Sequence, residues 1–528
     1  MRNLSHAAIL AAAFTALAPA AACSGDDDGD GSGDGSGDGG GGGGGLFDDP
    51  SDFDRGSCGP EAAVDAIDPI GIWHADLSFP DGAGVATFRV DPGASAGELT
   101  GLVYSSEAEA VRLAGGDLFL RREVDFDGVN QVFAIDLCRV EEDGSVSGQM
   151  AQCYGGDCSV GQIHGYRVAR LDEPEAENMT LVSEWRGPED APWDETLTVN
   201  VRHRGTVAYL VGVSDGLHIV DLEDPAQPAD LGHLPVAFPG EESFNDVKVY
   251  DAADGKVYAF LASDLRGVVV ADVTDPTDPI EVLAFPSPSV GTSRVNVHTL
   301  FLEGDRLYVA NISIAGVQIF DIAAPDQPVA LGAYVHPTVG TFGGFVHDLS
   351  VRDGVAYLDY WNLGLVVVDT SDPAEPHRVG EFDDYSRRTS HSNWVTEVGG
   401  RRIAVHGDED FDAHVRIIDV DPGSSTAFQE IGSYRTRPQV SVHNIMAIDE
   451  LALVTYYQDG LRVLDLSDPE DPVEIAHFDS WTGVGPDYGR GFFEGGIGVD
   501  HDAGRDLVLL ADTHRGLLVL TLDRPTAR

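Results

Sequence analysis

Positive charge is scarce in this sequence. Its 528 residues include 32 lysines and arginines against 89 aspartates and glutamates, so the formal net charge is −57 at pH 7. An acidic surface of this strength repels nucleic acid and anionic membrane, which removes both from the expected direct partners. The acidity itself has two interpretations: solubility in a salty, cation-rich medium, or binding of divalent cations along carboxylate-rich loops.

Long hydrophobic runs are lacking as well. The one apolar stretch, residues 7–18, is too short to span a bilayer stably, and it follows a positive start at Arg2. This pattern is typical of a signal peptide, which we expect to cover residues 1–22. No later segment of the sequence has this character, so we expect no further membrane segment.

Small residues precede Cys23 and resemble a bacterial lipobox. The resemblance implies that Cys23 is diacylated and becomes the mature N-terminus, so that lipid provides the only membrane contact. Secretion without this modification is the alternative. Residues 24–45 contain only glycine, serine and aspartate and cannot build a core. We therefore predict a flexible, self-repelling tether over residues 23–57.

Cysteine is absent beyond residue 158. Besides Cys23, the chain has Cys58, Cys138, Cys153 and Cys158. In an exported protein an even number of cysteines predicts disulfides, here two, and the sequence leaves the three pairings open. Residues 58–172 also contain seven short strand-like segments bounded by Asp-Gly, Gly-Gly and Pro-Gly turns. We predict a small, antiparallel, disulfide-bearing β-barrel or sandwich domain there.

A phrase such as Gly364–Pro373, GLVVVDTSDP, recurs seven times in the rest of the chain. Its closing prolines lie 47 to 56 residues apart, and a fixed period of this length predicts a β-array. The closing prolines are Pro225, Pro276, Pro325, Pro373, Pro422, Pro469 and Pro525.

Each unit predicts four strands. In the unit at residues 346–383 they are residues 346–351, 354–360, 364–370 and 377–382. The seventh unit lacks a fourth strand, and residues 180–185, just before the first unit, can supply it. Pairing the first strand with the last closes a ring and leaves no free edge. The sequence thus predicts an all-β chain in which residues 179–525 form a seven-bladed β-propeller, with an open solenoid as the alternative.

This phrase resembles the LVIVD repeat of bacterial and archaeal surface proteins, over about residues 195–525. The resemblance implies a propeller and a location at the cell surface, and it implies no particular reaction. The fifth unit adds a second resemblance. Its residues 390–394, SHSNW, and 406–409, HGDE, are similar to a pattern in related repeat-bearing surface proteins that are classed by their anchors.

Histidine gathers at one position of the repeat. The chain has 17 histidines, and four successive units place one just before their first strand. In a propeller this strand lines the channel, and the second strand ends on the same face. The aligned residues are Glu195, Asn245, His298, His347, His391, His443 and Gly495. The predicted channel-rim binding residues are Asn245, His298, Asn311, His347, Asp348, Trp361, His391, Trp394, Asp408, Glu409, His443, Asn444, Glu494 and His514.

Three interpretations of these histidines remain open. They could be repeat architecture, each bonding the backbone of the adjacent blade. They could bind a divalent metal, zinc or calcium, through two or three imidazoles assisted by a carboxylate. They could also form a docking face for a ligand or protein without metal. The candidate metal ligands are His298, His347, His391, His443, Asp408 and Glu409.

One catalytic motif is set aside. Residues 212–216, GVSDG, fit the G-x-S-x-G pattern, but a nucleophile elbow needs a strand-to-helix turn and a β-hairpin is predicted here. We therefore expect a monomeric lipoprotein exported to the bacterial cell envelope, at the outer membrane or surface. Its propeller is expected to be a protein- or glycan-binding scaffold. The alternative is a metal-dependent hydrolase with its site at the channel mouth.

Overall fold

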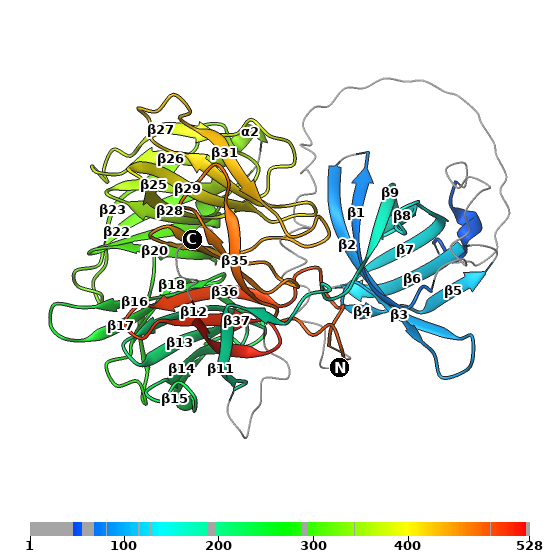
Figure 1. Ribbon diagram of the computed structural model, residues 1–528, viewed down its shortest axis with the longest axis horizontal. Coiled ribbons are helices and arrows are strands. Elements are labelled where there is room, and N and C mark those ends of the chain that lie inside the picture. The colour runs from blue at the N-terminus through cyan, green and yellow to red at the C-terminus, as the bar shows by residue number, and fades with distance from the viewer. Residues whose placement is uncertain are drawn as a thin grey trace. The chain divides into compact units, whose positions relative to one another are not determined.

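The computed structural model describes residues 46–54, 68–80, 82–114, 117–126, 128–187, 197–287, 294–342, 344–485 and 487–523. The predicted signal peptide, Cys23, the tether to residue 45, Cys58 and Glu195 lie outside these ranges. The chain divides into two compact units (Figure 1): Met1–Val168 with Gly489–Phe492, and Ala169–Tyr488 with Phe493–Arg528. Among the described residues, no helix is long and apolar enough to cross a membrane.

The N-terminal unit contains one nine-stranded antiparallel sheet in the order β4-β3-β2-β1-β9-β8-β7-β6-β5. The sheet curls so that β3 and β5, near its opposite edges, approach one another. The predicted barrel or sandwich is therefore a single curled sheet. Its strands are β1 (Gly71–Phe79), β2 (Gly82–Pro92), β3 (Leu99–Val103), β4 (Ser106–Glu107), β5 (Ala110–Ala114), β6 (Asp117–Phe126), β7 (Val129–Val140), β8 (Val146–Tyr154) and β9 (Asp157–Val168), preceded by the 3-10 turn η1 (Pro50–Asp52).

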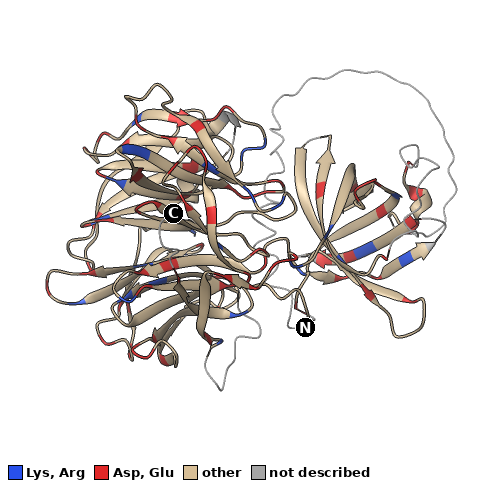
Figure 2. Ribbon diagram, viewed as in Figure 1, with Lys and Arg blue, Asp and Glu red and all other residues tan. Residues whose placement is uncertain are grey.

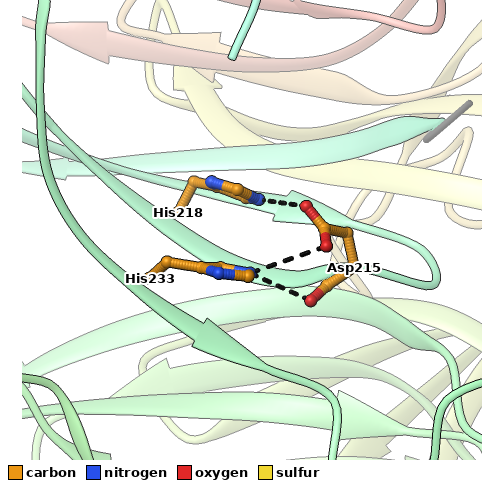
Figure 3. Close-up of side chains that lie close together, drawn as sticks. All are labelled: Asp215, His218 and His233. Atoms are coloured by element: carbon orange, nitrogen blue, oxygen red, sulfur yellow. Dashed lines mark hydrogen bonds and ion pairs between the residues drawn. The ribbon is translucent and has the colours of Figure 1, made fainter. Parts of the chain in front are cut away.

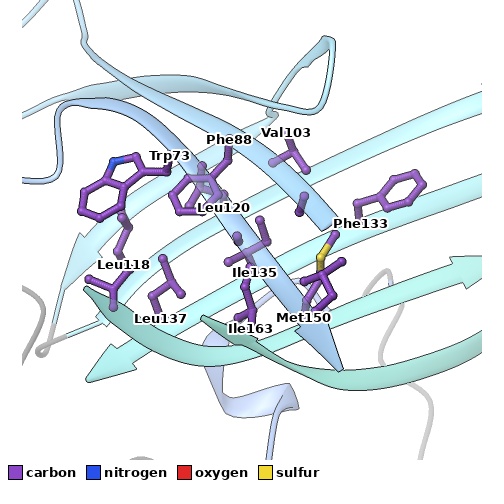
Figure 4. Close-up of a cluster of buried hydrophobic side chains, with 14 of the residues drawn as sticks. Trp73, Phe88, Val103, Leu118, Leu120, Phe133, Ile135, Leu137, Met150 and Ile163 are labelled. Atoms are coloured by element: carbon purple, nitrogen blue, oxygen red, sulfur yellow. The ribbon is translucent and has the colours of Figure 1, made fainter. Parts of the chain in front are cut away.

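The inner face of this sheet carries a closed apolar core (Figure 4). Trp73 and Phe88 stack with their ring centroids 5.9 Å apart. A disulfide joins Cys153 to Cys158 across the β8–β9 hairpin. Cys138 on β7 is disulfide-bonded too. The predicted disulfide-bearing character of this domain is confirmed.

The described residues of the second unit form seven antiparallel sheets, six with four strands and one with five. Four strands of each sheet follow one another in the chain, except in the last sheet, where three do. The first blade consists of β12 (Thr198–Arg204), β13 (Val207–Gly212), β14 (Gly216–Asp221) and β15 (Ala229–Pro235). The second consists of β16 (Phe244–Asp251), β17 (Val257–Ser263), β18 (Gly267–Asp272) and β19 (Ile280–Phe285). The third consists of β20 (Val297–Glu303), β21 (Arg306–Asn311), β22 (Gly316–Asp321) and β23 (Val329–Val335). The short η4 (Ile312–Ile314) and α2 (Val339–Phe342) lie in connections.

The other four sheets complete the propeller. The fourth blade has β24 (Val346–Arg352), β25 (Val355–Tyr360), β26 (Gly364–Asp369) and β27 (His377–Phe382), and the fifth has β28 (Ser390–Val398), β29 (Arg401–Asp408), β30 (Val415–Asp419) and β31 (Gln429–Tyr434). The sixth has β32 (Ile445–Ile448), β33 (Leu451–Thr455), β34 (Leu461–Asp465) and β35 (Val473–Phe478). The seventh has β36 (Gly496–Asp502), β37 (Leu507–Asp512), β38 (Gly516–Leu522) and β11 (Met179–Trp185). A two-residue strand, β10 (Ala176–Glu177), adds a fifth strand to the sixth sheet.

The predicted closure of the ring is confirmed. Strand β11 pairs with β38 in an antiparallel ladder that runs from Met179 opposite Leu522 to Trp185 opposite Leu517. The third strand of each blade is almost wholly buried, as in β26, because neighbouring sheets cover both of its faces. Outer strands such as β19 are largely exposed. Acidic residues are spread over strands and loops, and basic residues are fewer (Figure 2).

The proline that closes the repeated phrase serves as a contact between blades. A β-carbon on Gly332, in β23 of the third blade, would clash with the carbonyl oxygen of Pro373 in the fourth. The same approach joins Gly232 to Pro276 and Gly432 to Pro469. At the seventh-to-first junction, the Ser183 hydroxyl donates to the Pro225 carbonyl oxygen at 2.6 Å. Outer strands therefore pack directly against the backbone of the next blade.

This contact predicts the effect of adding one methyl group. Gly332→Ala should destabilise the propeller by about 1–3 kcal/mol, because the β-carbon meets backbone that must move. Gly340→Ala is the matched control, since its exposed β-carbon would have no neighbour within 4 Å. Chemical denaturation of both variants measures the difference. Equal stability of the two would refute the proposed packing.

Candidate functional site

A β-bulge marks the channel-side start of the first strand in six blades. The register shifts between Val297 and Leu300 in β20, and between Val346 and Leu349 in β24, and the other strands behave alike. A bulge re-aims the side chain that it carries. The residues at these bulges include Val199, Asn245, His298, His347, His391 and Ile497. Val199 and Ile497 thus hold the places for which Glu195 and Gly495 were predicted.

The four predicted histidines form one continuous arc. Ring centroids lie 4.1 Å apart for His298 and His347, and 4.0 Å apart for His347 and His391. His443, just before β32, follows at 4.4 Å from His391 and packs on Tyr457 at 4.8 Å. Equivalent positions of successive blades are therefore close enough to share a ligand. We call His298, His347, His391 and His443 the histidine arc.

Backbone bonding accounts for only part of this arc. The Nδ1 atom of His443 lies 2.7 Å from the carbonyl oxygen of Ile497 in the next blade. His347 has a backbone contact with His391. The buried Nδ1 atoms of His347 and His391 have no hydrogen-bond partner among the described residues. Buried polar atoms normally have hydrogen-bond partners, so the contacts of the fold do not account for these two nitrogen atoms.

Glu409 faces the arc from the end of β29. Its Oε2 atom is 3.5 Å from His391 Nε2, and its Oε1 atom is 3.8 Å from His443 Nε2. The Tyr457 hydroxyl donates a hydrogen bond to Oε1. His347, His391 and Glu409 are all buried, and each offers a ligand atom within 4.8 Å of the others. This set combines two imidazoles with one carboxylate.

Burial decides the protonation of this cluster. It lowers the pKa of His298 to about 4 and that of His443 to about 3. It also lowers the pKa values of His347 and His391 well below the ordinary value. Burial raises the pKa of Glu409 to about 8. At neutral pH the arc therefore consists of uncharged imidazoles beside a protonated carboxyl group.

Aromatic rings flank the arc. The ring centroid of Trp361 lies 5.1 Å from that of His347. Trp361 also stacks on half-buried Phe345, with ring centroids 5.7 Å apart. At the other end, Tyr457 packs against Phe493 at 5.0 Å. Tyr457 was not singled out from the sequence. It occupies the same place after the second strand as Trp361, so the aligned repeat carried the signal.

Asp408 is engaged elsewhere than in the arc. Its carboxylate accepts from the Tyr385 hydroxyl at 3.0 Å and from the Thr389 backbone at 3.0 Å, and it pairs with the Arg416 guanidinium. This carboxylate therefore holds the fifth blade together. Of the two carboxylates predicted as metal ligands, the structure brings only Glu409 to within 4 Å of arc nitrogens.

The other predicted rim residues differ in their surroundings. Trp394 packs on Phe301 at 5.7 Å, along the channel strands. Burial raises the pKa of Asp348 to about 6, against the opposing charge of Lys248. Asn245 and Asn444 are half-buried.

Three more are held in local contacts. Asn311 donates to Gln318 Oε1 at 2.7 Å and caps η4. Glu494 accepts from the Trp481 indole at 3.2 Å. His514 stacks on Tyr488 at 4.5 Å. These residues support the turns around the channel face.

A known protein family matches part of the repeated region of the chain. The LVIVD repeat family model matches residues 245–286 and 343–384, which are the second and fourth blades. Comparison with curated proteins gives no match. Among solved structures, the chain is similar to the computationally designed Ika8 protein (10% identity, 64% of this chain, 98% of that chain, TM-score 0.41). It is also similar to U3-55K (11%, 65%, 98%, 0.47) and to the WD40 β-propeller domain of Doa1 (9%, 65%, 97%, 0.45). The chain is therefore a seven-bladed β-propeller protein that carries LVIVD repeats.

Proposed function

We propose that this protein is a binding module displayed on the bacterial cell envelope, and that the histidine arc with its aromatic flanks is the binding site. A propeller is commonly a protein-interaction scaffold. Phe345 and Trp361 add stacking surface, and Glu409 and the arc add hydrogen-bonding groups. The chemistry fits a protein or glycan partner, in which apolar faces alternate with hydroxyl or amide groups.

One observation carries this proposal. The fold leaves the buried Nδ1 atoms of His347 and His391 without a partner, and leaving such atoms unsatisfied costs free energy. A bound ligand that supplies the missing hydrogen bonds recovers that cost. The neutral state of the arc favours a ligand group that is uncharged or positively charged over an anion, in line with the net charge of −57.

The binding proposal predicts the outcome of substitution at Phe345. Glycan and peptide arrays probed with the purified chain should reveal a selective ligand class. Phe345→Ala should weaken binding by roughly thirtyfold, which corresponds to loss of an aromatic hot spot of about 2 kcal/mol. Phe345→Tyr should retain most of the affinity. Val473→Ala, on the exposed outer strand β35, is the control. Failure to find a ligand that discriminates Phe345→Ala from Val473→Ala would sink the proposal.

Display on the envelope rests on the sequence before the first domain. The lipobox-like residues before Cys23 and the Gly/Ser/Asp tether support lipid anchoring of the mature chain. Lipid attachment gives the propeller access to partners outside the cytoplasm. The disulfide between Cys153 and Cys158 and the disulfide-bonded Cys138 support export of the N-terminal domain to an oxidising compartment.

Anchoring predicts that the lipid attached to Cys23 incorporates a radioactive fatty acid. Cells expressing the full chain and fed a radioactive fatty acid should label this protein and retain it in the membrane fraction. Cys23→Ser should lose the label and release the protein to the soluble or periplasmic fraction. A matched substitution in the tether, Ser32→Ala, should leave both properties unchanged. Unlabelled wild-type protein would refute the anchor.

A metal-dependent hydrolase is the second candidate, and the convergence of His347, His391 and Glu409 favours it. Two neutral imidazoles and one carboxylate are a ligand set that zinc accepts, with a fourth position left for water. Metal binding here requires that Glu409 lose its proton, because a carboxylate binds metal in its ionised form.

The metal candidate predicts a pH dependence. Since the pKa of Glu409 is raised to about 8, zinc affinity at the arc should fall roughly tenfold for each pH unit below 8. Glu409→Gln should remove that slope together with most of the affinity, and Glu397→Gln, exposed on β28, should change neither. Calorimetric zinc titrations from pH 6 to 9 measure both. Zinc binding that is absent, or unaffected by Glu409→Gln, eliminates the hydrolase candidate.

A further inference from the structure

A second group of potential metal ligands lies in the first blade, away from the histidine arc. Asp215 is in the turn between β13 and β14, His218 is on β14, and His233 is on β15 (Figure 3). His218 and His233 are direct cross-strand partners, and their rings stack with centroids 4.2 Å apart. We call these three residues the first-blade triad.

Both imidazoles present the same nitrogen to Asp215. The Nε2 atom of His218 is 2.6 Å from Oδ2 of Asp215. The Nε2 atom of His233 is 3.0 Å from the backbone oxygen of Asp215 and 3.7 Å from Oδ1. The three ligand atoms all lie within 4.8 Å of one another. Two Nε2 atoms, a carboxylate and a carbonyl oxygen thus converge on one small volume.

The repeat itself does not require this pair of histidines. No other blade places two imidazoles opposite each other at this point. The corresponding pairs are Val269 with Ala284, Gln318 with Ala333, Val366 with Glu381, Arg416 with Ser433, Arg462 with His477, and Leu518 with Glu184. Apolar, polar and charged pairs all build the same ladder, so packing alone does not explain the two histidines in blade one.

In the metal-free triad, both imidazoles are hydrogen-bonded to Asp215 and one side is open to solvent. The hydrogen bond from His218 lowers the pKa of Asp215, which keeps the carboxylate ionised. The Nε2 atom of His233 likewise donates its proton to the Asp215 carbonyl oxygen, so metal binding requires each imidazole to move its Nε2 proton to Nδ1. The His218 side chain is 5% exposed, whereas those of Asp215 and His233 are 38% and 37% exposed. Ions therefore have access from solvent on one side of the triad.

We propose that Asp215, His218 and His233 bind a divalent transition-metal ion, with zinc as the best-matched ion. Zinc–nitrogen bonds of about 2.0–2.1 Å place tetrahedral ligand atoms about 3.3 Å apart. Asp215 reaches that spacing by a small movement of its half-exposed side chain, which exchanges the hydrogen bond to His218 for two metal bonds. The exposed side leaves a coordination position for water or for an oxygen of a bound partner.

Zinc titration of the full chain by calorimetry, followed by metal analysis after dialysis, tests the first-blade site. Zinc should bind the wild-type chain at the triad, and both His233→Gln and Asp215→Asn should abolish binding of that equivalent. His377→Gln, an exposed histidine on β27, should retain it. Using two variants guards against misfolding of one of them, which circular dichroism reports.

A second readout locates the ion. The Trp185 ring centroid is 5.6 Å from that of His218, so Cu²⁺ bound at the triad should quench the fluorescence of Trp185. The quenching should disappear in His233→Gln and in Trp185→Phe, and persist in His391→Ala, which alters only the arc. Zinc binding and quenching that survive both His233→Gln and Asp215→Asn would overturn the proposal. Loss in His391→Ala alone would assign the ion to the channel instead.

Discussion

Closure of the ring by β11 is the constraint on which the rest of the propeller depends. Each four-stranded sheet has two faces and two edges that it cannot bury by itself. The ladder between β11 and β38 joins residues more than 300 positions apart in sequence and removes the last open junction. Closure also sets the spacing of the innermost strands, so that neighbouring imidazoles of the arc meet at 4.0 to 4.4 Å. The site is therefore a property of the closed ring, and no isolated blade contains it.

Most of the architecture could be predicted from the sequence, because the repeat is local. Seven closing prolines and one spare strand at residues 180–185 were enough to predict seven blades and their closure. The packing of Gly332 on Pro373 could not be predicted in this way, because the two residues belong to different blades and the contact depends on how the sheets are inclined. The curled sheet of the N-terminal domain is a similar case. Its strands were visible as short segments, but one curled sheet and two packed sheets produce the same alternation.

The candidate site was predictable in composition and only partly in geometry. Aligning the repeats placed four histidines at one register, and the structure brings them together. The sequence alignment was wrong by register in the first and seventh blades, where Val199 and Ile497, rather than the aligned Glu195 and Gly495, occupy the bulge. A bulge shifts side-chain direction by one residue, and hydrogen-bond register is not written in the local sequence. For the same reason Asp408 and Glu409, adjacent in sequence, separate: one pairs with Arg416, and the other faces the arc.

The two histidine clusters differ chiefly in their access to water, and this difference decides what each can bind. In the channel, burial keeps the imidazoles neutral and Glu409 protonated, so a metal must displace a proton and a neutral ligand need not. In the first blade, half-exposed Asp215 is already ionised, so a cation does not have to displace a proton from the carboxyl group. Both clusters use positions at which the blades vary, whereas backbone contacts between neighbouring blades, such as that of Gly332 with Pro373, recur around the ring. A repeat of this kind can therefore acquire new ligand sets at the varying positions without weakening the closure that makes the fold stable.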